Sequence, residues 1–336
     1  MADPASPPAR PGNARVAVLG AATLEGRKLR EELARQRVPG GRVDLYGTLR
    51  GEALLGEYAG EARLIQEPDL EEVARHDVVF VCELSDTADR IVTMADRQAV
   101  VIDLTGKSVG REAMRLVHHG ISPDPPKARG ALLAPPHPIA ALLAEILHPL
   151  QREVGVREAL ATVLRPAADF GEDGIDELRE QTVRLLGFEK APTQVFGRQL
   201  AFDVIPESLL AAREAGLERR IAREVRTLLG WKEDRLSVRL VCVPVFVGHA
   251  ISLRLVPERS TDAAAVMRST GLARPPGPRG RKSGGTPLSA PEERRTEVCE
   301  VVDDGLGGFW IWAIAGGAGS AAAEQAVRAA AAVCDL

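Results

Sequence analysis

The stretch LAPPHPIAALL, from Leu133 to Leu143, has the form of a helix entrance at which an enzyme could keep a nucleophile. Proline-flanked backbone leads into an apolar run with helical spacing, and His137 and Pro138 stand at the entrance. Proline suits the first helical turn because its missing N–H costs little there. The stretch contains neither a thiol nor a hydroxyl. The sequence therefore predicts a helix N-terminus that lacks a nucleophilic side chain.

A second candidate site is the segment GAATLEG, from Gly20 to Gly26, between a short apolar run and a helical pattern. In a dinucleotide-binding turn, backbone N–H groups and the helix N-terminus face a pyrophosphate. Thr23 stands at the middle glycine position, and Glu25 places a negative charge in the first turn. The candidate cofactor-binding residues are Gly20, Ala22, Thr23, Leu24 and Glu25. The alternative is a tight turn whose glycines serve packing alone.

The cysteines and histidines do not indicate a metal site. Cys82, Cys242, Cys299 and Cys334 are scattered without a CxxC pair, which predicts reduced thiols and no zinc cage. His137 and His148 are likewise not expected to bind a metal ion.

Composition limits the class of protein. The chain has 336 residues, 45% hydrophobic content and a net charge of −4, which predicts a soluble protein with two domains. The aromatic content is 4%, so we expect no base-stacking platform and no nucleic-acid partner. We found no signal peptide and no convincing membrane span, and therefore expect a cytoplasmic protein without a membrane partner.

The elements that would position these residues fall into two groups. After a disordered head at 1–12, unbroken apolar strands alternate with helices, which predicts a Rossmann-like parallel sheet in a dinucleotide-binding-type domain at 13–134. Longer strands and amphipathic helices predict an α+β domain with a mixed sheet at 135–313. Its Pro- and Gly-rich segment 273–295 is expected to be a flexible loop, with a basic binding patch as the alternative. We expect 314–336 to form a helix that packs on the first domain.

Six phrases follow the order and rough spacing of the aspartate-semialdehyde dehydrogenase family, which the chain resembles over nearly its whole length. They are VAVLGAATLEG, LYGTLRGEA, LLAPPHPIAALLAEILHPL, GIDELREQT, RQLAFDVIP and VCVPVFVGHA. The resemblance implies a two-domain enzyme that reduces aspartyl phosphate with NADPH through a cysteine thioester. It also implies a homodimer formed through the sheet of the second domain.

The positions that carry the family's chemistry differ in this chain. The family's PNC phrase aligns with PHP, which puts Pro138 at the cysteine. The substrate-orienting glutamine falls on Arg165, and the substrate-binding arginine falls on Cys242. A second arginine falls near Val109, with Lys107 as a stand-in. Ile314 and Ala315 replace a polar pair that closes over the cofactor.

Two family positions are retained. His249 matches the general acid/base, and Arg50 matches an arginine that meets the NADP 2′-phosphate. The alternatives are a hydrogen-bonded structural role for His249 and a surface role for Arg50. Cys242 is a core cysteine or, as an alternative, a relocated nucleophile.

The sequence therefore predicts a catalytically inactive, homodimeric homologue with a binding or regulatory role, with a partner in amino-acid metabolism and weak NADP binding or no cofactor. The alternatives are a dinucleotide or metabolite sensor and a divergent NAD(P)-dependent oxidoreductase acting on an aldehyde or acyl substrate in amino-acid biosynthesis.

Overall fold

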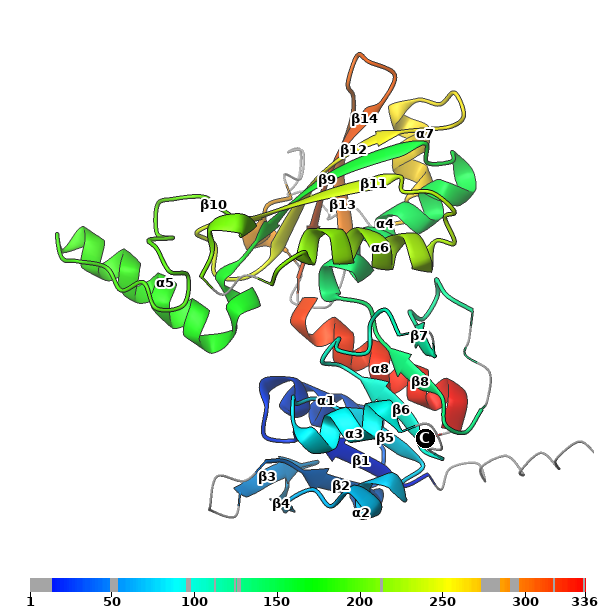
Figure 1. Ribbon diagram of the computed structural model, residues 1–336. Helices are drawn as coiled ribbons and strands as arrows, with labels where there is room; N and C mark the ends of the chain where they lie inside the picture. Colours follow the sequence, from blue (N-terminus) through cyan, green and yellow to red (C-terminus); the bar gives the residue numbers. More distant parts are fainter. Residues whose placement is uncertain are drawn as a thin grey trace, which may run out of the picture. The chain divides into compact units, whose positions relative to one another are not determined.

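The chain divides into two compact units, residues 1–136 with 320–336, and residues 137–319. The computed structural model in Figure 1 describes residues 14–48, 54–94, 98–111, 113–123, 125, 128–211, 214–272, 285–290, 296–316, 318–334 and 336. The expected head at 1–12 and most of the expected loop at 273–295 lie outside these residues.

The first unit contains a parallel sheet with the strand order β2-β1-β5-β6-β8-β7. Its strands are β1 (Val16–Leu19), β2 (Val43–Tyr46), β5 (Val78–Val81), β6 (Val100–Asp103), β7 (Met114–Leu116) and β8 (Leu132–Ala134). The central strands are buried along their whole length, which is why they appear in the sequence as unbroken apolar runs. The predicted Rossmann-like sheet is confirmed.

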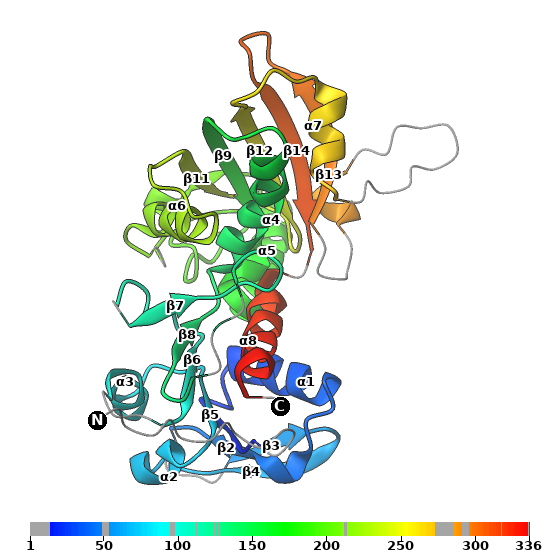
Figure 2. The same cartoon turned by 90° about the vertical axis from the view of Figure 1, so that its right-hand side faces the viewer.

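Helices cover both faces of this sheet. On one face, α1 (Leu24–Arg35) and α8 (Ala318–Cys334) share an apolar core and lie side by side in Figure 2. On the other face, α2 (Leu70–Ala74) and α3 (Asp86–Thr93) pack against the sheet. A hairpin of β3 (Leu54–Tyr58) and β4 (Glu61–Ile65) continues from β2 through the bridge Tyr46–Gln66.

The second unit contains a mixed sheet with the strand order β10-β11-β9-β12-β14-β13. Its strands are β9 (Glu158–Arg165), β10 (Ile205–Pro206), β11 (Leu236–Cys242), β12 (His249–Val256), β13 (Thr296–Asp303) and β14 (Phe309–Ala315). β9 and β11 are parallel, and the other neighbours are antiparallel, so the predicted mixed sheet is confirmed.

The apolar segment 235–256 forms two strands rather than one. Residues 243–248 leave the sheet between β11 and β12, and Gly248 has φ +88°. A Cβ at Gly248 would lie 2.6 Å from the carbonyl oxygen of Pro287, so a larger residue would be excluded. This break places His249 at the first position of β12.

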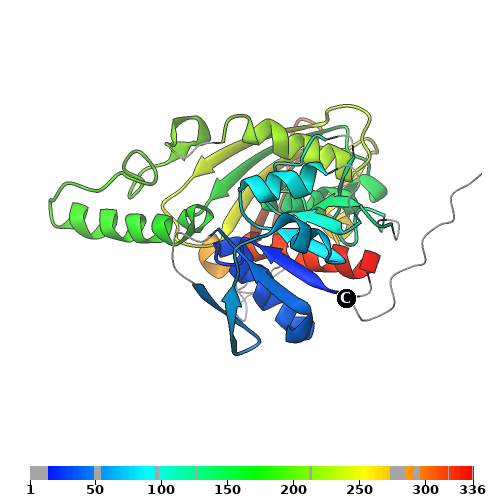
Figure 3. The same ribbon diagram turned by 60° about the horizontal axis from the view of Figure 1, so that its bottom comes forward.

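One face of the mixed sheet packs on α4 (Pro138–Glu153), α6 (Leu217–Leu228) and α7 (Ala263–Ser269). The long helix α5 (Gly171–Leu186) and the segment that returns along it, residues 187–210, form a projection that we call the arm (Figure 3). Short 3₁₀ turns lie at Gly40–Arg42, Ala167–Phe170, Glu207–Leu209 and Pro287–Ser289. Among the described residues, no helix is long and apolar enough to cross a membrane.

Buried polar side chains hold the arm together. The Glu177 carboxylate accepts the N–H groups of Val195 (2.6 Å) and Phe196 (3.2 Å). The Gln181 amide accepts from Leu200 and Ala201 and donates to backbone carbonyls of the returning segment. Two of the phrases that carry the family resemblance, GIDELREQT and RQLAFDVIP, are therefore the two sides of this clamp.

Candidate functional site

The entrance of α4 is built by His137 and Pro138. Pro138 occupies the first helical position, and the Nδ1 atom of His137 accepts the N–H of Ile139 at 3.2 Å as the N-cap. Because Nδ1 accepts, the proton of the neutral imidazole resides on Nε2. The backbone N–H of His137 donates to the Glu224 carboxylate of α6 at 2.6 Å. The N–H groups at the start of a helix have no acceptor within the helix, and these two bonds supply acceptors for the N–H groups of His137 and Ile139.

The environment keeps His137 uncharged. Burial, followed by the positive charges of Arg220 and Arg165, lowers the pKa of His137 to about 3. Burial also raises the pKa of Glu224, although Arg220 donates to that carboxylate at 2.8 Å. His137 is therefore the neutral imidazole at the entrance of α4.

Arg165, at the end of β9, is the centre of a buried ion-pair cluster. Its Nε donates to Asp169 at 2.9 Å, and its Nη1 donates to Glu207 of the arm. The guanidinium carbon lies 4.9 Å from the centroid of the Phe170 ring. Burial opposes the charge of Arg165, yet the charges of Asp169 and Glu207 raise its pKa.

His249 belongs to the same cluster. Its Nε2 lies 3.0 Å from Oδ1 and 3.1 Å from Oδ2 of Asp169, and the ring is buried. Burial disfavours the Asp169 charge, but His249 and then Arg165 lower the pKa of Asp169 well below its usual range. The partner of His249 is thus a carboxylate that also holds Arg165, an arrangement that suits the structural alternative for this histidine.

Cys242 lies in the register position directly opposite Arg165 in the parallel pair β9–β11. The side chain is fully buried in an apolar cluster with Phe196, Leu200 and Ile205. Burial raises the pKa of the Cys242 thiol to about 12, so the thiolate that nucleophilic attack requires is disfavoured. The environment matches the core-cysteine alternative.

The turn in the first unit uses its outer glycines for packing. Gly20 has φ +87°, and a Cβ there would lie 2.6 Å from Cβ of Glu83. A Cβ at Gly26 would lie 2.2 Å from the carbonyl oxygen of Gly20. Thr23 is the N-cap of α1: its Oγ1 accepts the N–H of Gly26 at 3.0 Å and donates to the Gly20 carbonyl at 2.8 Å.

The remaining cofactor candidates surround this turn. Ala22 and Glu25 are exposed, and Leu24 is the first residue of α1. Thr48 follows β2 and Glu83 follows β5, and these two strands flank β1. The Thr48 hydroxyl donates to the Glu83 carboxylate at 3.0 Å, and the Thr48 N–H donates to the same carboxylate at 3.3 Å. Arg50 lies outside the described residues.

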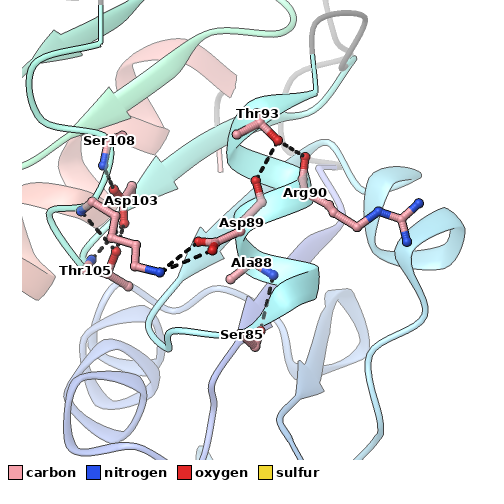
Figure 4. Close-up of polar contacts among 9 residues, drawn as sticks. Ser85, Ala88, Asp89, Arg90, Thr93, Asp103, Thr105 and Ser108 are labelled. Carbon is pink, nitrogen blue, oxygen red and sulfur yellow. Dashed lines mark hydrogen bonds and ion pairs between the residues drawn. The ribbon is translucent and has the colours of Figure 1, made fainter.

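Lys107, which the resemblance predicts as a stand-in for a substrate-binding arginine, is ion-paired within the first unit. Its Nζ lies 3.1 and 3.2 Å from the two oxygens of Asp89 (Figure 4). The loop that carries it is fixed by Asp103, whose carboxylate accepts from Thr105 and from the N–H of Ser108. In the second unit, Ile314 and Ala315 are buried in β14.

Sequence reasoning missed four members of the cluster, Asp169, Glu207, Arg220 and Glu224. Asp169 follows Arg165 by four residues, and Glu207 directly follows the RQLAFDVIP phrase. Both carboxylates can be seen in the sequence. Their contact with Arg165, however, depends on strand pairing and on the path of the arm. In the sequence, Arg165 and Cys242 appear as two separate changes from the family pattern. The strand register places them side by side.

A doubly wound parallel-sheet unit and a mixed-sheet unit define a two-unit α/β protein with a dinucleotide-binding-type fold. Solved structures share it over nearly the whole chain. A probable aspartate-semialdehyde dehydrogenase from Pseudomonas aeruginosa has a TM-score of 0.78 at 24% identity and covers 95% of this chain and 97% of its own. The enzyme with NADP from Candida albicans has a TM-score of 0.65 at 15% identity, over 96% and 99%.

Sequence comparison gives the family. No family model matches the chain. A USG-1 protein homolog of Pseudomonas aeruginosa is 34% identical over 139 residues, 41% of each chain, so that alignment spans less than half the relative's length. The aspartate-semialdehyde dehydrogenase of Rickettsia bellii is 27% identical over 75% of each chain, and a USG-1 protein homolog of Azotobacter vinelandii is 26% identical over 78% and 79%. The relatives and the solved structures are aspartate-semialdehyde dehydrogenases and USG-1 protein homologs, so the predicted resemblance to the aspartate-semialdehyde dehydrogenase family is confirmed.

Proposed function

We propose that this protein is a non-catalytic member of its family that acts in amino-acid metabolism by binding, as a regulatory or partner subunit. The observation that carries the proposal is Pro138 at the first position of α4. The resemblance places the thioester-forming cysteine at this position, and proline has no group that can attack a carbonyl carbon. The helix is kept while the nucleophile is absent.

No other thiol of the chain is suited to replace it. Cys82, Cys242, Cys299 and Cys334 are all buried, and burial raises the pKa of Cys242 to about 12 and also raises the pKa of Cys82. Arg165 is not a free cation for an acidic substrate either, because Asp169 and Glu207 already neutralise it. Both the nucleophile and the open substrate cation that acyl transfer would need are missing from this cluster.

The turn residues in the first unit do not fit a dinucleotide pyrophosphate. Thr23 occupies the N–H of Gly26 with its own hydroxyl, so that donor is not directed at a phosphate. Glu25 in the first turn and Glu83 beside Gly20 add negative charge where a pyrophosphate would lie. These residues therefore do not support a hydride-transfer step, and we expect NADP⁺ to bind weakly.

A homodimer through the mixed sheet is part of this proposal. The face opposite α4 and α6 carries a row of paired residues, Leu160, Arg254 and Trp310, on β9, β12 and β14. Trp310 is 47% exposed and Leu160 is 41% exposed. Apolar side chains on a sheet face lose water contact when a second copy covers them, and a self-complementary pair has two-fold symmetry.

The test is an assay of the purified full chain with aspartate semialdehyde, NADP⁺ and phosphate, followed by absorbance at 340 nm. We expect no reduction of NADP⁺ above a blank without protein. Turnover that is lost in Cys242→Ala would contradict the proposal and identify Cys242 as a relocated nucleophile. Turnover that survives Cys242→Ala would contradict it as well and would point to a mechanism without this thiol.

A further inference from the structure

A small hollow lies within the first unit, between the segment that follows β7 and the second half of α8; we call it the α8 hollow. Its volume is about 20 Å³, and Val117, Ala329 and Ala332 form its apolar part. One water molecule requires about 10–15 Å³ by the same measure, so the hollow is too small for a nucleotide or an amino acid. It suits a small ion, or the end group of a ligand whose remainder stays in solvent.

Polar side chains of α8 gather at this hollow. The helix sequence AGSAAAEQAVRAAAAVC is mostly alanine, and its Gln325 and Arg328 both line the hollow. They are three positions apart and therefore lie on the same side of the helix. Glu324 pairs with Arg328 at 2.8 Å and orients the guanidinium. A guanidinium has five N–H donors, and one carboxylate accepts at most two of them in a fork, so donors remain for a second anion.

The segment opposite α8 forms a tight turn that is tied to the helix. The His118 N–H donates to Oγ of Ser122 at 2.8 Å, and this hydroxyl donates to the His118 carbonyl at 3.1 Å. The His119 N–H donates to Oε1 of Gln325 at 2.7 Å. Because Oε1 accepts this backbone N–H, the other end of the Gln325 amide is the NH₂ group, which can only donate. The backbone of the turn thus uses the amide and hydroxyl oxygens at the hollow.

The polar groups that remain for a ligand are nitrogen donors. They are the Gln325 NH₂ group, the Arg328 guanidinium and the imidazole of His119, which is exposed and also lines the hollow. Nitrogen donors around a guanidinium select oxyanions through charge-assisted hydrogen bonds.

We propose that the α8 hollow binds a tetrahedral oxyanion, either a free phosphate or sulfate ion or the phosphate group of a metabolite. None of the positions that the resemblance assigns to substrate or cofactor lines this hollow, so the inference goes beyond the proposed function and does not depend on it. An anion held by Arg328 and His119 joins α8 to the segment after β7, which are far apart in the chain. Because the bound state contains both segments in their folded positions, the ligand stabilises the packing of α8 on the first unit.

The experiment is calorimetric titration of the full chain and of Arg328→Gln with sodium phosphate at constant ionic strength. Loss of the guanidinium should weaken phosphate binding by about tenfold or more, because it removes charge-assisted hydrogen bonds. The matched control is Arg184→Gln on α5, where the arginine also pairs with a glutamate four positions earlier, at 2.6 Å. The two arginine side chains are similarly exposed, 46% in the control and 41% at Arg328. The control should bind phosphate as the unmodified chain does.

Further arms of the experiment define the ligand and locate it. Sulfate should compete with phosphate, whereas acetate, with one charge and two oxygens, should bind about tenfold more weakly. Methyl phosphate distinguishes the sources: equal binding assigns the hollow to the phosphate group of a metabolite, and no binding assigns it to the free ion. Phosphate should also slow hydrogen exchange in α8 of the unmodified chain and leave exchange in α8 of Arg328→Gln unchanged.

The proposal is overturned if millimolar phosphate does not bind, if Arg328→Gln and Arg184→Gln bind it equally well, or if acetate binds as tightly as phosphate. Reduction of NADP⁺ is not a readout of this experiment. Dehydrogenase activity would therefore refute the proposed non-catalytic function without affecting the α8 hollow, and an absence of phosphate binding would refute only the oxyanion site.

Discussion

Arg165 and Cys242 face each other in register on the parallel strands β9 and β11. The two predicted departures from the family pattern, at Arg165 and at Cys242, therefore fall at one location in the second unit, where a cation lies beside a buried thiol. The neighbouring carboxylates Asp169 and Glu207 neutralise that cation, and this arrangement underlies the predictions for the site.

Restoring a thiol at the α4 entrance should not restore turnover. In Pro138→Cys the new thiol lies at a helix N-terminus, where its reactivity with iodoacetamide should exceed that of the four buried cysteines. Arg165 would still be bound by Asp169 and Glu207. Correct orientation supplies roughly 7–11 kcal/mol of such catalysis in favourable cases. NADP⁺ reduction with aspartate semialdehyde should stay at blank level, and robust activity of this single variant would show that the other changes matter little.

The cap formed by His137 should make stability depend on pH. The free side chain takes up a proton near pH 6.5, whereas the folded chain does so only near pH 3. The unfolded state thus binds more protons between these values, so the contribution is complete above pH 6.5 and is lost as pH falls toward 3. At about 1.4 kcal/mol per pH unit, the loss reaches up to about 3 kcal/mol at pH 4.

His137→Asn isolates this effect because asparagine caps helices well and does not titrate. Chemical denaturation at pH 7 and at pH 4 should show a smaller difference in unfolding free energy for the variant than for the unmodified chain. Equal pH dependence in the two proteins would mean that His137 is not the group responsible.

The arm should open when its clamp is removed. In Gln181→Leu the N–H groups of Leu200 and Ala201 and the carbonyl of Pro192 lose their partner. Unsatisfied buried backbone groups cost about 1–3 kcal/mol each, so a local destabilisation of about 2–4 kcal/mol is expected after relaxation. Hydrogen exchange at residues 195–201 should accelerate by one to three orders of magnitude, at roughly tenfold per 1.4 kcal/mol. The control Gln199→Leu removes one bond from an exposed side chain and should leave exchange nearly unchanged.

The mixed sheet should form the interface of a homodimer. Light scattering of the unmodified chain should give twice its mass of 35.9 kDa over a dilution series. Leu160→Glu places a charge within the row Leu160, Arg254 and Trp310 and should shift the mass toward the monomer. Leu306→Glu makes the same change in the turn between β13 and β14, where the leucine is 82% exposed, and should remain dimeric. A constant mass near 36 kDa for the unmodified chain at high concentration would exclude the dimer.

The sequence by itself determined the two kinds of sheet and the helix that begins at Pro138. Unbroken apolar runs reveal strands that are buried on both faces, and alternation or helical spacing reveals elements with one covered face. These signals are local, because they depend on which side of each element meets the core. The resemblance to the family added the order of the units and the prediction that Pro138 stands at the nucleophile position.

Only the tertiary structure decided that Arg165 lies beside Cys242 and that Glu207 and Asp169 occupy it. Strand register and the return of the arm are set by contacts between residues up to about eighty positions apart, for which no short window of sequence carries a signal. The roles of Gly20 and Gly26 required coordinates for the same reason, since their importance comes from atoms of Glu83 and of the turn that approach their α-carbons.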